Sequence, residues 1–592
     1  MTPPPEAAGP VPAVLSIQDL VKQFTVGART LTALNRVSIQ VRPGTVTGLI
    51  GPDGAGKTTL MRLIAGLLLP DSGTLNVLGM DVVQDPLKVQ HSIGYMPQRF
   101  GLYEDLTVQE NLDLYADLQG LPRADRPARY AELTKMTGLA PFAKRLAGDL
   151  SGGMKQKLGL ACVLVQPPRM LLLDEPTVGV DPVSRRELWA IVYRLVQQEG
   201  MAVLLSTAYL DEAERCDDVI LLHRGEVLGQ GPPVDFSQTM KGRSFQVVDS
   251  GMNKRSLQGQ LVRAEGVLDA TIQRNGVRIV MKPGATADAG RLLPDRPEAD
   301  IQEVPPRFED SFISLLREKD GAAPVPLASL NARISVAAGT DIITVDQVKR
   351  RFGDFYAVKG ISFSVQAGEV FGLLGANGAG KSTTFRMLCG LLPATAGHLS
   401  VAGKDLRHAP AQARAHIGYM AQKFSLYSDL SVQENLAFFS RVYGLRQPER
   451  GERVKWALEE FELGSYAATA ASQLPLGYKQ RLAMAAALMH HPQILFLDEP
   501  TSGVDPLARR EFWLRINQLA EEGVTVLVTT HFMEEAEYCD RLVIMAEGSL
   551  LAEGTPDAMR EQARSKEMPD PTMEDAFIHL IEKHAKEEAS HG

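Results

Sequence analysis

The sequence predicts an α/β fold that contains two P-loop domains in tandem and a small α/β appendage after the first domain. A long repeat carries this prediction: the segment GLIGPDGAGKTTLMRLIAGLL from Gly48 recurs as GLLGANGAGKSTTFRMLCGLL from Gly372. Likewise IGYMPQRFGLYEDLTVQENL from Ile93 recurs as IGYMAQKFSLYSDLSVQENL from Ile417. In both copies a short apolar run leads into GxxxxGK[ST] and then into a helical run, the context in which this pattern indicates a phosphate-binding loop.

The boundaries of the repeat predict the organisation of the chain. PRFEDSFISLL from Pro306 matches PTMEDAFIHLI from Pro571, which indicates a closing helix in each copy, and alternating apolar residues predict strands at 244–248 and 277–281. Prolines at the start of the chain indicate an extended tail, and an Ala/Pro/Gly/Ser-rich stretch indicates a linker. The predicted segments are a disordered tail at 1–13, a first ATPase domain at 14–236, the α/β appendage and closing helix at 237–318, a linker at 319–341, a second ATPase domain at 342–556, and a closing helix and tail at 557–592.

Composition restricts the possible functions. The 592 residues include 62 Lys+Arg and 71 Asp+Glu, for a formal net charge of −9, so no general basic field attracts a nucleic acid and we expect no nucleic-acid partner. The four cysteines are scattered without a Cys-x-x-Cys pair, which argues against a zinc site or a disulfide framework. The longest apolar runs are far shorter than the roughly 18 residues that a membrane span requires.

Each phosphate-binding loop supplies groups suited to a nucleotide. Glycines allow the backbone to wrap closely, the exposed N–H groups at the helix N-terminus cradle phosphate oxygens, and the lysine neutralises the terminal phosphates. The hydroxyl after each lysine is placed to bind Mg²⁺. The loop residues that we expect to bind ATP are Gly51, Gly54, Gly56, Lys57, Thr58 and Thr59 in the first copy, and Gly375, Asn377, Gly378, Gly380, Lys381, Ser382 and Thr383 in the second.

An apolar run that ends in two carboxylates follows each loop, at Asp174–Glu175 and at Asp498–Glu499. The first acid of each pair can hold the Mg²⁺ shell together with the loop hydroxyl, and the second can polarise a water for in-line attack on the γ-phosphate. We therefore assign the metal to Thr58, Asp174, Ser382 and Asp498, and catalysis to Glu175 and Glu499.

Further motifs complete a set that resembles the ATP-binding cassette (ABC) family. They are a glutamine after each loop, the sequence LSGGMKQ from Leu150 in the first copy, and a histidine after the second pair of acids. The resemblance implies two nucleotide-binding domains, each with a helical subdomain, that close head to tail with each ATP between one loop and the opposite signature. It implies adenine stacking by Phe24 and Phe352, catalytic roles for Gln422 and His531, and contacts to the ATP site from Gln98, Ser151, Gly152, Gly153 and the D-loop acids Asp181 and Asp505.

The two copies depart from the family pattern at complementary places. Ala208 stands where the second copy has His531, and the second signature reads LPLGYKQ, with Pro475 and Leu476. Proline offers no N–H, leucine adds bulk where glycine permits close approach, and alanine cannot contact a γ-phosphate. If the halves pair with each other, both losses fall on the nucleotide at Lys57, so we expect one competent and one degenerate ATP site.

The closing helix, PxxEDxFIxL, and the tandem arrangement resemble the ATP-binding subunits of bacterial ABC-2-type multidrug exporters. The resemblance implies that ATP hydrolysis, with ATP and Mg²⁺, powers export of drugs or other xenobiotics through two separate integral-membrane permease subunits. Of the possible pairs a permease heterodimer is favoured, and a periplasmic adaptor is a further candidate partner. The implied location is the cytoplasmic face of the bacterial inner membrane.

Two other classes of tandem ABC ATPase remain as alternatives. ATPases that act on the ribosome keep both signatures and join their halves by a long charged linker, whereas this linker is nearly uncharged. Sugar-importer ATPases usually lose the catalytic set of the second half, whereas here the second half has the better set. The transported substrate is not encoded in this chain, because a transport ATPase does not touch its cargo.

Overall fold

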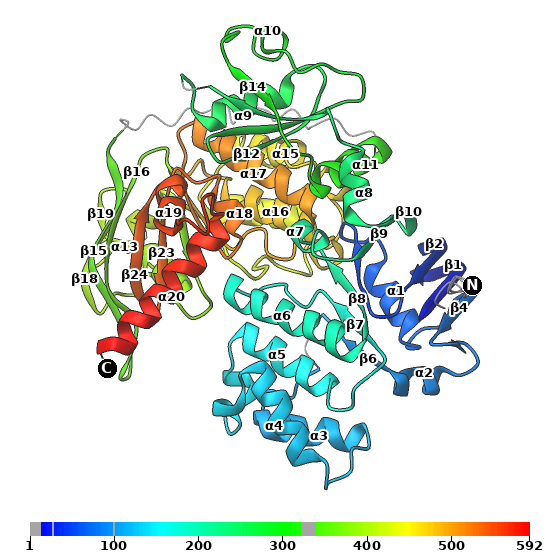
Figure 1. Ribbon diagram of the computed structural model, residues 1–592. Helices are drawn as coiled ribbons and strands as arrows, with labels where there is room; N and C mark the ends of the chain where they lie inside the picture. The colour runs from blue at the N-terminus through cyan, green and yellow to red at the C-terminus, as the bar shows by residue number, and fades with distance from the viewer. Residues whose placement is uncertain (1–12, 27–28, 99–100, 250, 321–338, 592) are drawn as a thin grey trace. The chain divides into compact units, whose positions relative to one another are not determined.

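The computed structural model describes residues 13–26, 29–98, 101–249, 251–320 and 339–591 (Figure 1). These residues form two compact units. The first comprises the described residues of 1–180, 184–241 and 306–319, and the second those of 181–183, 242–305 and 320–592.

A six-stranded sheet forms the centre of the first unit. In spatial order its strands are β10 Glu226–Gly231, β9 Asp218–His223, β3 Val46–Ile50, β8 Ala202–Thr207, β7 Met170–Asp174 and β6 Ile93–Met96. The pairs from β9 to β6 are parallel, and β10 is an antiparallel edge strand. Every residue of β3, β7, β8 and β9 is buried, which explains why these strands are continuous apolar runs in the sequence.

An antiparallel sheet shares the hydrophobic core of this unit. In spatial order its strands are β2 Arg29–Val41, β1 Leu15–Val26, β4 Ser72–Val77 and β5 Met80–Asp81. Leu20 of β1 and Leu34 of β2 pack in one core with Leu60 of helix α1 (Lys57–Ile64) and Leu204 of β8. The helix that begins at the loop lysine is therefore fixed between the two sheets.

The remaining helices of the first unit include a helical subdomain formed by α3, α4 and α5 (Figure 1). Helix α3 begins with a capping box, because Thr107 accepts a hydrogen bond from the Glu110 backbone N–H and donates its own backbone N–H to the Glu110 carboxylate. The helices are α2 Pro86–Ser92, α3 Val108–Leu118, α4 Arg126–Thr137, α5 Gly152–Val163, α6 Pro182–Glu199, α7 Leu210–Ala213, α8 Pro233–Gln238 and α11 Phe308–Asp320, with 3₁₀ turns at Ala140–Phe142 and Ala147–Asp149.

The second unit repeats this architecture. Its six-stranded sheet runs in the order β20 Ile417–Met420, β21 Ile494–Asp498, β22 Thr525–Thr530, β17 Val370–Gly375, β23 Arg541–Ala546 and β24 Ser549–Gly554, and its antiparallel sheet in the order β16 Phe355–Gln366, β15 Asp341–Phe352, β18 Ala396–Val401 and β19 Lys404–Asp405. Its helices are α12 Lys381–Leu388, α13 Pro410–Arg414, α14 Val432–Val442, α15 Glu449–Glu460, α16 Leu476–Ala487, α17 Pro506–Glu521, α18 Met533–Ala536, α19 Pro556–Ala563 and α20 Met573–His591, with 3₁₀ turns at Gly464–Tyr466 and Ala471–Gln473.

The appendage is a βαββαβ unit with a four-stranded antiparallel sheet. Its elements are β11 Ser244–Val248, α9 Lys254–Arg263, β12 Val267–Gln273, β13 Gly276–Met281, α10 Ala289–Leu292 and β14 Asp300–Glu303, in the sheet order β12-β13-β11-β14. Strands β11 and β13 confirm the two strands that alternation predicted. The predicted grouping of 237–318 differs from the contacts, because 242–305 packs with the second unit and 306–319 with the first.

The two closing helices pack on equivalent elements of their own domains. At the start of α11 the Phe308 backbone N–H donates to Glu214 at 3.0 Å, and its ring meets Phe236 of α8 edge to face. In the second domain Phe577 of α20 is buried in one core with Leu374 of β17. The helices therefore complete cores that would otherwise face solvent.

Parts of the predicted organisation lie outside the described residues. These are 1–12 of the tail and 321–338 of the linker. Among the helices that the structure describes, none is both long enough and apolar enough to cross a membrane.

A buried asparagine braces the loop that follows each predicted site glutamine, Gln98 in the first copy and Gln422 in the second. Asn435 of α14 donates to the carbonyls of Tyr427, Leu430 and Ser431 at 2.9–3.1 Å, and its Oδ1 accepts from the Tyr427 N–H at 3.0 Å. Asn111 makes the same four contacts in the first copy. Each asparagine thus replaces hydrogen bonds that a turn of this length cannot make by itself.

We expect Asn435→Ala to lower the free energy of unfolding by about 2 kcal/mol, because several buried backbone groups lose their partner. Urea denaturation followed by circular dichroism measures this change. Gln433→Ala, at an exposed position of the same helix, is the control and should change stability by less than about 0.5 kcal/mol. Equal effects of the two substitutions would contradict the bracing role.

Candidate functional site

The phosphate-binding loops adopt a conformation that requires glycine. Gly56 and Gly380 precede the loop helices with φ of 105° and 96°, a left-handed conformation that favours glycine. A Cβ on Gly51 would lie 2.1 Å from the Leu222 carbonyl oxygen, and one on Gly375 would lie 2.5 Å from that of Met545. The loops therefore follow their neighbouring strands more closely than any side chain would permit.

The loop lysines are buried at the carboxyl ends of β3 and β17. The Nζ of Lys57 donates to the carbonyls of Gly51 at 2.7 Å and Pro52 at 3.2 Å, and Lys381 makes the same contacts to Gly375 at 2.6 Å and Ala376 at 3.1 Å. Burial lowers the pKa of Lys381, although nearby acids oppose this shift. Each ammonium group is held by its own loop, where it would contact the phosphates of a bound nucleotide.

The other predicted loop residues continue into the first turns of these helices. Thr58, Thr59, Ser382 and Thr383 lie in α1 or α12, directly after the lysines. Gly54 and Gly378 have positive φ of 77° and 85°, with no atom within 4 Å of a Cβ placed on them. The loop is thus open on this side, next to Asn377.

Each pair of acids lies at the end of a buried strand, β7 or β21. One strand, β8 or β22, separates it from the strand that leads into the phosphate-binding loop. Glu175 and Glu499 have φ of 52° and 45°, a conformation that side chains rarely adopt. The backbone N–H of Glu175 donates to Ser206 Oγ at 2.9 Å, and Ser206 Oγ donates to Asp174 Oδ1 at 2.7 Å. Thr529 makes the equivalent contacts in the second domain, at 2.9 and 2.6 Å.

The structure brings the predicted glutamines to these glutamates. Gln98 Nε2 donates to Glu175 Oε2 at 2.5 Å, and Gln422 Nε2 donates to Glu499 Oε2 at 2.7 Å. Lys57 Nζ lies 3.8 Å from Glu175 Oε1. Lysine, glutamate and glutamine from distant parts of the sequence therefore form one cluster in each domain.

His531 joins this cluster in the second domain only. Its Nδ1 lies 3.2 Å from Glu499 Oε2, and its Nε2 is buried without a hydrogen-bond partner among the described residues. The ring packs on Phe532, 4.2 Å between centroids. At the matched position of the first domain Ala208 is buried and supplies no polar group.

This difference gives the two predicted catalytic glutamates different electrostatic environments. Burial raises the pKa of Glu175, and the nearby charge of Lys57 offsets only part of the shift. Burial also acts on Glu499, but the hydrogen bond and charge of His531, together with Lys381, hold the pKa of that carboxyl below its usual range. The carboxylate of Glu499 is therefore the more firmly ionised of the two.

The residues assigned to Mg²⁺ have suitable chemistry. Asp174 Oδ2 is buried and accepts no hydrogen bond within the described residues, so a metal-bound water would satisfy it. Burial raises the pKa of Asp498, which Thr529 and Lys381 partly oppose, and a cation nearby would favour its charged form. The carboxylate and hydroxyl oxygens of these groups are ligands that Mg²⁺ prefers.

The two predicted adenine-stacking residues lie near the hairpin ends of the antiparallel sheets. Phe24 pairs with Leu31 across the β1–β2 hairpin, and Phe352 pairs with Phe355 across the β15–β16 hairpin. Phe352 is 47% exposed, with the Arg350 guanidinium 4.5 Å from its ring centroid. The Phe352 ring is thus accessible to a ligand, whereas Phe24 is half-buried with Lys22 Nζ 5.5 Å from its ring centroid.

The two signatures differ in the start of their helices. Ser151 caps α5 by accepting the Met154 N–H at 3.3 Å, and a Cβ on Gly153 would lie 2.4 Å from Ser184 Oγ. Pro475 precedes α16 without a side-chain cap. Helix α5, which begins at Gly152, therefore has a serine hydroxyl at its N-terminus. Helix α16 has no hydroxyl at the matched position.

The predicted D-loop acids, Asp181 and Asp505, each lie directly before a helix. Asp505 caps α17 by accepting the N–H groups of Leu507 and Ala508 at 3.1 and 3.0 Å. Asp181 is buried directly before α6.

Sequence reasoning did not single out one pair of buried acids, Glu212 and Glu535. Glu212 accepts hydrogen bonds from Thr177 and Thr207 at 3.0 and 2.7 Å and from the Trp189 ring at 3.1 Å, and Glu535 accepts from Thr501 and Thr530. Each joins the strand that precedes position 208 or 531 to the turn after the predicted catalytic glutamate. Their signal was present, because both occur in the matched segments YLDEAE and FMEEAE.

A loop lysine, a following hydroxyl, two strand-end acids and a glutamine at the carboxyl edge of a parallel sheet define a P-loop nucleoside triphosphatase. The ABC transporter family model matches residues 34–178 and 358–502. The chain is 53% identical over 578 residues to the probable multidrug ABC transporter ATP-binding protein YbhF of Escherichia coli (strain K12), covering 98% of this chain and 99% of that protein. The chain therefore belongs to the ABC transporter family, as an ATP-binding protein that hydrolyses ATP.

Some other relatives match over the length of one domain only. The linearmycin resistance ATP-binding protein LnrL of Bacillus subtilis (strain 168) is 42% identical over 215 residues, 36% of this chain and 69% of that protein. A solved structure of the ATP-binding subunit of an ABC transporter is 32% identical, with a TM-score of 0.35, and covers 38% of this chain and 92% of that one.

We expect the pH dependence of stability to expose the effect of His531. With the pKa of Glu499 lowered, its ionisation stabilises the fold above a pH of about 4.5 and loses this effect as pH falls through the lowered pKa. In His531→Ala, burial dominates and raises the pKa, so ionisation then opposes folding. The difference in Tm between the two proteins should therefore grow as pH rises from about 4 to about 6.

Ala208→His is the reciprocal variant, and it should lower the pKa of Glu175 and raise Tm most at the upper end of this range. Thermal unfolding at each pH measures both effects. A constant Tm difference across the range would contradict the assigned coupling.

Proposed function

We propose that this protein is the ATP-hydrolysing subunit of an exporter, and that it acts on separate ABC-2-type membrane permease subunits. The observation that carries this is the site at Lys381, Glu499, Gln422 and His531, which has every group for hydrolysis, in a chain similar over its whole length to a probable multidrug ABC transporter ATP-binding protein. The proposed location is the cytoplasmic face of the bacterial inner membrane, held there by the permeases.

In this proposal Glu499 accepts a proton from the attacking water, while Gln422 fixes the carboxylate and Lys381 neutralises the phosphates. The buried Nε2 of His531 donates to the γ-phosphate. Ser382 and Asp498 would hold Mg²⁺, which would supply charge stabilisation for phosphoryl transfer.

The two ATP sites are proposed to be unequal. Pairing of the halves within one chain would place the degenerate signature with Pro475 and the missing histidine at Ala208 on the same nucleotide, at Lys57. The other nucleotide, at Lys381, would then meet Ser151, whose hydroxyl and cap are intact. Pairing of like halves from two chains would instead give every site one lesion, so the distribution of changes supports the intramolecular arrangement.

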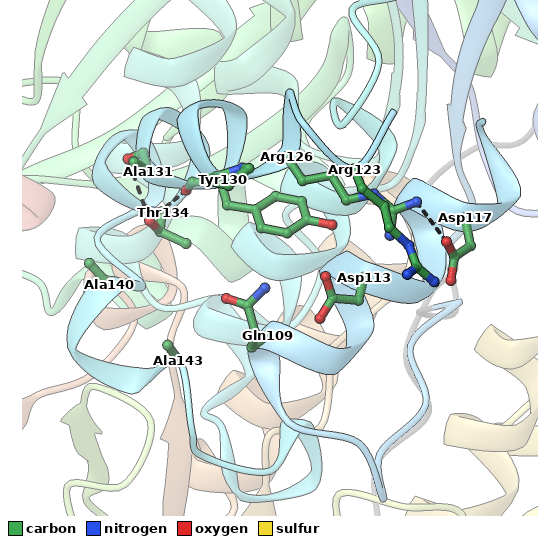
Figure 2. Close-up of a pocket in the computed structure, with 11 residues that line it drawn as sticks. Gln109, Asp113, Asp117, Arg123, Arg126, Tyr130, Ala131, Thr134, Ala140 and Ala143 are labelled. Atoms are coloured by element: carbon green, nitrogen blue, oxygen red, sulfur yellow. Dashed lines mark hydrogen bonds and ion pairs between the residues drawn. The ribbon is translucent and has the colours of Figure 1, made fainter. Parts of the chain in front are cut away.

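The surface near each glutamine supports docking of a membrane subunit. Tyr103 and Tyr427 follow the glutamines and are 59% and 51% exposed, and Val442 lies exposed at the end of α14. In the first domain a cavity of about 740 Å³ lies between α3 and α4, and Figure 2 shows the Asp117–Arg126 ion pair at one end and Gln109 and Tyr130 along it. Exposed aromatic residues are typical of protein interfaces.

The proposed cargo class is drugs or other xenobiotics. It rests on the similarity of the chain to a probable multidrug ABC transporter ATP-binding protein and to a linearmycin resistance ATP-binding protein. Two permease subunits that form a heterodimer fit two unlike docking faces, because α3 carries Asp113 and Asp117 where α14 carries Ala437 and Arg441. A periplasmic adaptor is a further proposed partner.

We expect Glu499→Gln to abolish most steady-state ATP hydrolysis, by about 100-fold or more, because the water loses its base. Glu175→Gln should leave most of the activity, since its site already lacks a histidine and an intact signature. Phosphate release by the purified chain at saturating MgATP measures both. Equal losses in the two variants would contradict unequal sites.

We expect the tagged Glu499→Gln protein, purified with MgATP from detergent-solubilised cells, to carry two polytopic membrane proteins, because loss of hydrolysis preserves the ATP-bound state. Mass spectrometry identifies the chains, and Lys381→Ala is the nucleotide-binding control. Recovery of ribosomal subunits without membrane proteins would replace the exporter by a ribosome-associated ATPase.

A further inference from the structure

The appendage at 242–305 follows the first ATPase domain in the sequence but packs on the second. Helix α9 lies against α17, and Tyr538, which follows α18, packs against the appendage core. The chain has two domains of the same fold on which the appendage could pack. Its packing on the second domain must therefore depend on residues that differ between the two domains.

Two buried polar contacts join the appendage to one helix, α17. Asp269 of β12 forms an ion pair with Arg510, and both are at least nine-tenths buried. Gln258 of α9 accepts a hydrogen bond from Asn517 Nδ2 at 2.8 Å and donates to the Ala270 carbonyl at 2.8 Å. Buried ion pairs add little net stability but fix the register of the surfaces that carry them.

Exposed contacts surround these two. Ser256 Oγ donates to Glu521 at 2.7 Å, at the far end of α17. Arg255 pairs with Asp540, whose Oδ2 also accepts the Val370 N–H at 2.8 Å at the start of β17, the strand that leads into the phosphate-binding loop. Arg274 pairs with Asp570. The appendage thus contacts α17 at both buried and exposed positions, and also the segment after α18.

Helix α17 connects these contacts to the predicted catalytic residues. Its N-terminus is capped by the D-loop acid Asp505. The Arg509 guanidinium lies 4.5 Å from the ring centroid of Phe532, next to His531, and Trp513 stacks on Tyr538 at 4.9 Å. A rotation of α17 would therefore move the D-loop and the support of His531 together.

From this arrangement we infer that the appendage is a positioning element for the second ATP site, and that Asp269 and Arg510 are its positioning residues. The pair fixes the rotation of α17, and α17 fixes Asp505 and the segment that carries His531. The inference rests on the proposed assignment of hydrolysis to the site at Lys381 and Glu499.

The first domain supports this reading, because its matched positions do not suit an appendage. Tyr193 stands where the second domain has Asn517, and its hydroxyl donates to the Arg215 carbonyl at 2.9 Å. Arg215 in turn stands where the second domain has Tyr538, and its guanidinium lies over Trp189. Arg186, which matches Arg510, is exposed.

The test measures kcat and KM for MgATP with the full chain. We expect Asp269→Asn and Arg510→Gln each to lower kcat about tenfold while KM stays within about twofold, because a small misplacement of catalytic groups slows the reaction more than it weakens binding. The double variant Asp269→Asn/Arg510→Gln leaves no unpaired buried charge, so it should fold normally and still show a lowered kcat. Arg510→Lys should recover part of the activity.

Arg186→Gln is the matched control in the first domain and should keep wild-type kcat. Amide hydrogen exchange of residues 505–521 adds a readout that activity does not give, and the double variant should exchange faster there. An unchanged kcat in folded variants, or a loss that follows only the fraction of unfolded protein, overturns the inference. If Glu499→Gln retains activity, the proposed function fails instead, whatever the appendage variants do.

Discussion

The charge of one buried lysine organises each nucleotide site of this protein. An ammonium group removed from water must be compensated, and here the carbonyls of its own loop and the neighbouring acids provide that compensation. The loop can reach these positions only because glycines allow it to touch the adjacent strand, and the strand is rigid because it is buried on both faces. The sheet, the helix and the acids are thus arranged around a positive charge, which is suited to pair with a phosphate group.

The second constraint is the single imidazole by which the two sites differ. The two domains have the same strands, the same glutamine–glutamate contact and the same hydroxyl contact to the acids. The environments of the two glutamates therefore differ chiefly by His531. Burial alone raises the pKa of a carboxyl group, whereas beside His531 the pKa of Glu499 is lowered. One imidazole is therefore enough to shift the pKa values of two similarly placed carboxyl groups in opposite directions, without a change of fold.

Much of this could be predicted from the sequence. The loop, the acid pairs and the glutamines carry their chemistry in fixed local patterns, and alternating apolar residues predicted the strands at 244–248 and 277–281, which are observed as β11 and β13. The attachment of the appendage could not be predicted, because Asp269 and Arg510 are ordinary charged residues until the fold places them together. The matched segments YLDEAE and FMEEAE mark the positions of Glu212 and Glu535, but their burial could not be predicted, because a buried acid differs from an exposed one only through its neighbours.

The crossed attachment of the appendage has a consequence for synthesis. Its βαββαβ unit leaves the ribosome about 200 residues before α17, so at about 5–20 residues per second it waits on the order of 10–40 s for the surface it covers. During that time Asp269 and Gln258 lack Arg510 and Asn517, the partners on α17 that they contact in the folded protein. The first ATPase domain, complete except for its closing helix α11, precedes it, while the second domain acquires its final packing only when a segment made much earlier returns to it.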